Sequence, residues 1–103
     1  MSAGLESLFR AYLHQDYDLQ YRSIGAAIRA FAVDASAPAR RRTLAEIDML
    51  LSQSTSDEDL HLALRQRGFT FFPPRDGETT AAWLRRARAI LADVEDTEEN
   101  RDR

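Results

Sequence analysis

Hydrophobic residues recur along this chain at helical spacing, in stretches separated by polar breaks. In the first stretch they fall at positions i, i+3, i+4, i+7 and i+8, which places them on one face of an amphipathic helix. These residues are Leu5, Leu8, Phe9, Tyr12 and Leu13. The next segment, 14–21, breaks the period with polar and aromatic residues side by side, so we expect an ordered loop there.

Two further helices are predicted before the middle of the chain. Ser23 is of a type that favours the N-cap position, and the second helix would bury Ile24, Ala27, Ile28 and Phe31. Residues 34–38 form a break, because Pro38 steers the residue before it away from helical geometry but fits the first turn of a new helix. The third helix would then bury Leu44, Ile47, Leu50 and Leu51.

A fourth helix has clear signals at both of its ends. Thr55 and Glu58 have the spacing of a capping box, and Ser56 is the alternative cap. The apolar face would be Leu60, Ala63 and Leu64. Gly68 suits the left-handed position just after the helix, which would let Phe69 fold back onto Leu64.

The aromatic segment 69–74 separates this helix from the last one. Two consecutive prolines favour an extended backbone, so we expect the segment to lie across the helices as a strap. Asp76 and Gly77 form a turn signal, and Thr79 or Thr80 can cap a fifth helix. This helix would bury Trp83, Ala87, Ile90, Leu91 and Val94. Residues 95–103 are charged and uncapped, which indicates a disordered tail.

These elements define an all-α fold, a compact bundle of about five helices with one extended aromatic and Pro-Pro segment. A chain of 103 residues fits one domain and one core, so we assign residues 1–94 to a single helical domain and 95–103 to the tail. A core of this size leaves little room for a deep pocket.

Charge and residue usage narrow the cellular setting. There is no cysteine, which excludes disulfides and thiolate metal sites. The N-terminal residues lack the pattern of a signal peptide, and no segment approaches the roughly 20 apolar residues of a membrane span. We therefore expect a cytoplasmic protein without membrane partners. The net charge of −3 argues against nucleic acid as the main partner, since that binding needs clustered positive charge.

Catalytic and metal-binding patterns are missing from the sequence. His14 has Asp16 and Asp18 nearby, but zinc needs three or four converging ligands at spacings that this chain lacks. His61 lies one helical turn after Asp57, where a modest surface pair is expected. The chain has neither a nucleophile elbow nor a Gly-rich phosphate loop. We therefore expect no enzyme activity, no metal and no cofactor, which leaves binding as the function.

Two binding alternatives follow from the residues alone. The run Arg40, Arg41 and Arg42 would suit a small helical nucleic-acid-binding regulator, although on a helix the three side chains fan outward as a solvated face. The aromatic residues of segment 69–74 would suit an adaptor that grips another protein. Core packing is the better interpretation for these aromatic residues and for Trp83, because a small domain needs large side chains in its interior.

Several local motifs occur together in an order that resembles a known family. The motif His14, Gln15, Asp16 and Tyr17 follows the first helix, and the block Pro73, Pro74, Gly77 and Trp83 comes late in the chain. In this order the chain resembles the small helical immunity proteins of bacterial contact-dependent growth inhibition systems, from about Leu5 to Leu91. Two positions depart from the pattern, since Leu13 stands where an aromatic residue is usual and Tyr17 where tryptophan is common.

This resemblance implies that the chain binds and neutralises the toxic C-terminal domain of an effector delivered by neighbouring cells. We expect that toxin to be a nuclease and the complex to be one-to-one. The two motif blocks are expected to serve the fold, with His14, Gln15, Asp16 and Tyr17 organising the first loop. The toxin would then be recognised by charged positions, for which we select Asp18, Asp57, Glu58, Asp59, Asp76 and Glu78. Replacing Asp57, Glu58 and Asp59 with Ala is predicted to weaken binding and to leave the melting temperature nearly unchanged.

Overall fold

The computed structural model of the chain describes residues 4–13, 23–71 and 73–101. The elements in chain order are α1 (Leu5–Ser7), the π-helical η1 (Leu8–Tyr12), α3 (Ile24–Asp34), α4 (Ala37–Gln53), α5 (Asp57–Arg65), the 3-10 helix η2 (Pro73–Asp76) and α6 (Thr80–Arg101). Within these described residues there is no strand. The all-α prediction is therefore confirmed.

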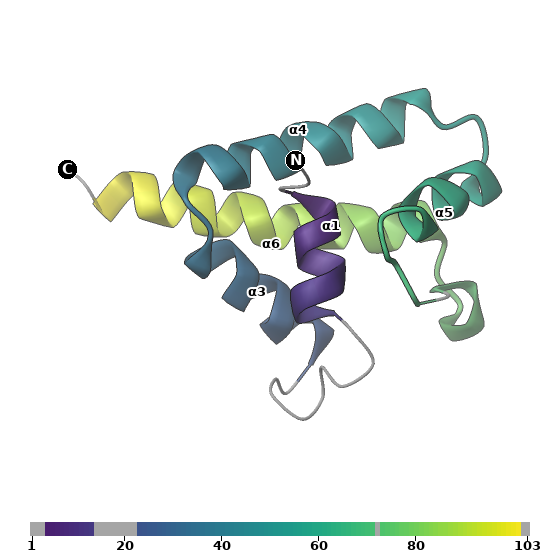
Figure 1. The fold of residues 1–103 in the computed structure, drawn as a ribbon, viewed down its shortest axis with the longest axis horizontal. Coiled ribbons are helices and arrows are strands. Elements are labelled where there is room, and N and C mark those ends of the chain that lie inside the picture. The colour runs from purple at the N-terminus through teal and green to yellow at the C-terminus, as the bar shows by residue number, and fades with distance from the viewer. Residues whose placement is uncertain (1–3, 14–22, 72, 102–103) are drawn as a thin grey trace.

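Helix α6 is the centre of the arrangement (Figure 1). It contacts α3, α4 and α5, while α1 contacts α4 and η1 contacts α3. The radius of gyration is 13.3 Å, close to the roughly 13 Å expected for a compact chain of about 100 residues. The helices thus form the predicted bundle around one long helix.

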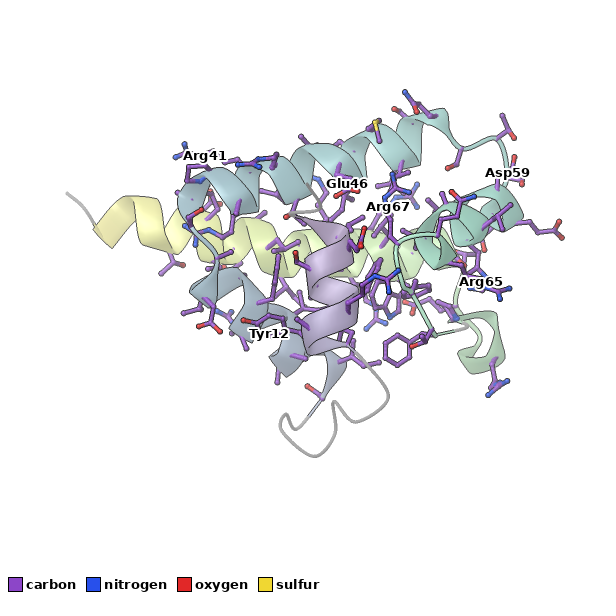
Figure 2. All side chains as sticks on the ribbon, in the orientation of Figure 1. Tyr12, Arg41, Glu46, Asp59, Arg65 and Arg67 are labelled. Atoms are coloured by element: carbon purple, nitrogen blue, oxygen red, sulfur yellow. The ribbon has the colours of Figure 1, made fainter. Side chains whose placement is uncertain are left out.

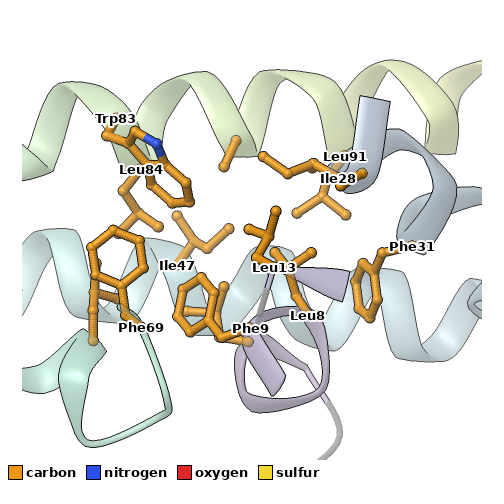
Figure 3. Packing of buried hydrophobic residues seen from close by; sticks show 14 of the residues in the cluster. Leu8, Phe9, Leu13, Ile28, Phe31, Ile47, Phe69, Trp83, Leu84 and Leu91 are labelled. Atoms are coloured by element: carbon orange, nitrogen blue, oxygen red, sulfur yellow. The ribbon is translucent and has the colours of Figure 1, made fainter. Parts of the chain in front are cut away.

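The hydrophobic core contains most of the residues that the sequence places on the apolar faces, and also Ala32 and Leu84, which the sequence analysis did not select (Figure 3). The other predicted residues are partly buried against it: Tyr12, Ile24, Leu44, Leu51, Ala63 and Ile90. Phe9, Phe69 and Trp83 form its aromatic part, with ring centroids 5.0 Å apart for Phe9 and Phe69 and 4.8 Å apart for Phe69 and Trp83. Ile28 and Ile47 extend the core between the longer helices. The prediction that Phe69 and Trp83 are core residues is confirmed, because both are buried.

The helix ends follow the capping signals in the sequence. The hydroxyls of Ser23 and Ser56 accept hydrogen bonds from Ala26 N and Asp59 N, so Ser56 caps α5 in preference to Thr55. Gly68 has a φ of 98°, and Phe69 N donates to Leu64 O, as in a Schellman motif. These turns fix where α3 and α5 begin and how the chain leaves α5.

The first helix differs from the α-helix that the periodicity predicts. It changes to π-helical geometry at Leu8, and Leu13 N donates to Leu8 O across five residues. This wider turn brings Leu13 into line with Leu8, and both side chains are buried. The predicted apolar face therefore survives with a changed backbone.

Two other expectations are wrong in detail. Pro73 and Pro74 begin the 3-10 helix η2 and are not extended. The N–H groups in the first turn of a helix have no partner within the helix, so a proline, which lacks an N–H, can stand there without loss. Helix α6 continues to Arg101 and does not end near Val94. Its extension begins at Glu95, whose carboxylate is held by Arg40 and is therefore fixed against the bundle.

Candidate partner-binding surface

The first turns of α5 and α6 are joined by one carboxylate. Asp57 accepts hydrogen bonds from Thr80 N at 2.9 Å and from Ala81 N at 3.0 Å. Two backbone N–H groups at the start of α6 are thereby satisfied by a residue of another helix. Asp57 therefore has a structural task, and we now expect its replacement within the triple Ala variant to lower the melting temperature.

The environment of Asp57 stabilises its ionised form. Desolvation raises the pKa of the carboxyl, but the hydrogen bonds from Thr80 and Ala81 and the nearby charge of His61 outweigh it. The pKa of Asp57 is therefore lowered from the ordinary 3.8. The carboxylate stays charged at neutral pH, where it complements the positive end of α6.

Glu58 and Asp59 behave differently from Asp57. Both are exposed on the first turn of α5, and neither forms an ion pair with a described residue. Asp59 accepts a hydrogen bond from the hydroxyl of Thr55, and Figure 2 shows it on the outer side of α5. These two carboxylates are therefore available to a cationic partner.

An exposed leucine lies beside these carboxylates. Leu62 is 56% exposed, and it follows Glu58 by four residues and Asp59 by three, so all three share one face of α5. We call Glu58, Asp59 and Leu62 the α5 outer face. Sequence reasoning missed Leu62, although its position opposite the buried Leu60 and Leu64 in the helical repeat could have indicated it.

The remaining acidic candidates are more widely distributed. Glu78 forms a two-point ion pair with Arg86, with both N–O distances at 2.7 Å. Asp76 ends η2 in the turn before Glu78, while Asp18 lies outside the described residues. The motif residues His14, Gln15, Asp16 and Tyr17 also lie outside the described part of the chain. Their proposed role in the first loop stays a prediction.

The arginine run does not form a solvated face. Arg40 is only 4% exposed, and its guanidinium donates to Ala32 O, Ala35 O and Glu95 Oε1. Arg41 pairs with the other oxygen of Glu95. Arg42 alone is exposed without an ion pair to a described residue. The interpretation of all three as solvated is wrong for Arg40, and this arrangement gives no support to a three-arginine nucleic-acid surface.

Other ion pairs hold the helices in place. Glu46 accepts from Leu5 N at 3.0 Å and from Arg67 Nε at 2.6 Å, so it ties the start of α1 to the turn that follows α5 (Figure 2). Asp48 and Arg88 join α4 to α6, and the hydrogen bond from Arg88 lowers the pKa of Asp48. These contacts fix the frame that presents the α5 outer face.

A groove runs between the start of α3 and the first half of α6. Its volume is about 540 Å³, and its apolar walls are Ile24, Ile28, Trp83, Ala87 and Ile90. Polar groups at the groove come from Ser23 and Arg86. Sequence reasoning did not find this groove, because the two walls belong to helices far apart in the sequence.

The described residues also bear on metal binding, on the role of His61 and on membrane spans. Within the part of the chain that the structure describes, no three His, Cys, Asp or Glu side chains are placed to hold a metal ion. His61 is engaged through Nε2 with the carbonyl of Phe71 at 3.1 Å. No described helix is long and apolar enough to cross a membrane.

The described elements define a class of small helical domain, with exposed carboxylates and an exposed leucine on α5 and an open groove between α3 and α6. Comparison with protein families makes the class specific, since a family model described as CdiI immunity protein matches residues 2–91. The chain belongs to this family, which confirms the resemblance found in the sequence, and membership implies neutralisation of a contact-dependent growth inhibition toxin. No curated protein and no solved structure matches the chain.

Proposed function

We propose that this chain is a stoichiometric inhibitor that binds the toxic C-terminal domain of its cognate effector in the cytoplasm. The toxin would be a nuclease, and the complex one-to-one. The observation that carries the proposal is the family match over residues 2–91. The surface features of α5 support it and give it a testable location.

Charge complementarity favours a nuclease as the toxin. An enzyme that acts on nucleic acid presents positive charge to the phosphate backbone. The chain has a net charge of −3, and Glu58 and Asp59 are exposed without an ion pair to a described residue. Opposite charges of this kind speed association and sharpen the choice of partner.

The exposed leucine supplies the apolar part of the same contact. An apolar side chain that a partner covers contributes to binding through the area that it removes from water. Complete burial of a leucine is worth about 1.5–3 kcal/mol. Leu62 is 56% exposed in the free chain, so much of that gain is still available to a complex.

The test is a titration of purified toxin domain, from the effector encoded beside this chain, into two variants of the α5 outer face. We expect Leu62→Ala to weaken binding by about tenfold, the equivalent of roughly 1.4 kcal/mol. The double variant Glu58→Ala, Asp59→Ala should lose more affinity at low salt than at high salt, because salt screens the attraction between these carboxylates and the toxin.

Matched control variants distinguish loss of a contact with the toxin from a general effect of removing an exposed side chain. Val33→Ala removes an apolar side chain of nearly equal exposure, 54%, from α3. Asp96→Ala removes an exposed carboxylate from α6. Both controls should bind as the unmodified chain does. If the α5 variants also bind normally, the α5 outer face is not the toxin contact; if the unmodified chain forms no complex, the proposed function is wrong.

A further inference from the structure

We draw no further inference here: the strongest candidate, the groove between the start of α3 and the first half of α6, has a lining that is at least as polar as it is apolar, and nothing in the described part of the chain shows what covers it.

Discussion

Arg40 gives the sharpest test of how this fold is held together. Its guanidinium joins three elements, since it donates to two carbonyls at the end of α3 and to Glu95 on α6 while belonging to α4. Replacement with Ala leaves Ala32 O and Ala35 O without this donor and leaves Glu95 with Arg41 only. We therefore predict a large loss of stability from Arg40→Ala.

The magnitude follows from the burial of the pair. The side chains of Arg40 and Glu95 are 4% and 12% exposed, and removing one partner of such a pair costs about 3–5 kcal/mol. Because Arg41 continues to pair with Glu95, we take the lower end, about 3 kcal/mol. For a domain of this length that corresponds to a fall in melting temperature of roughly 15 °C.

Thermal and urea unfolding followed by circular dichroism would measure this change. Arg41→Ala and Arg42→Ala are the neighbouring controls, and each should cost at most about 0.5 kcal/mol. The ion pair of Arg41 is exposed on the arginine side and so contributes little, and Arg42 has no ion pair with a described residue. Equal stability of all three variants would refute the reasoning, since it would mean that the buried guanidinium is no more important than its exposed neighbours.

Three further predictions concern helix ends. Asp57→Asn should lower the free energy of unfolding by about 1–2 kcal/mol at pH 7. Because the folded-state pKa of Asp57 is lowered, the stability that its carboxylate contributes is complete above the ordinary pKa of 3.8 and is lost as the pH falls through the folded-state pKa. In urea titrations the stabilities of the variant and the parent should therefore converge in acid. A difference that stays constant with pH would contradict this reasoning. Gly68→Ala should cost about 1–2 kcal/mol from its positive φ alone, and more because the new Cβ would lie 2.9 Å from Arg10 Cγ. Gly77→Ala should cost less than Gly68→Ala in thermal unfolding, because a Cβ at Gly77 would meet no atom within 4 Å, although φ is also positive there, at 80°.

Local signals in the sequence predicted much of the fold. Ser23 and Ser56 cap helices because a hydroxyl can reach an N–H three residues ahead, and Gly68 ends α5 because glycine readily adopts a positive φ. Phe69 and Trp83 are buried because their size makes exposure costly. Each of these properties depends on residues that are close together in the chain.

Contacts between distant residues account for most of what the sequence did not reveal. Asp57 looked like a free surface carboxylate, but the start of α6 lies against it and uses it as a cap. Arg40 looked like one of three solvated arginines, but its guanidinium reaches the end of α3 and shares Glu95 with Arg41. Composition and periodicity cannot report such pairings, because they depend on how whole helices pack.

The candidate binding surface was predicted only in part. Glu58 and Asp59 are exposed, in agreement with their selection on charge, but their role in binding stays a prediction. Leu62 was missed although the helical repeat leaves it off the predicted apolar face, and the groove beside Trp83 was missed because its two walls lie far apart in the sequence. A three-dimensional arrangement was needed to separate the apolar residues that face outward from those that face the core.

Titration of the toxin's activity with this chain tests the central claim most directly. With the toxin domain held at a fixed concentration well above the dissociation constant, its activity should fall in a straight line and reach zero at one equivalent of chain. Activity that persists with the chain in large excess, or that is abolished by a small fraction of an equivalent, would contradict a one-to-one inhibitor that acts by binding.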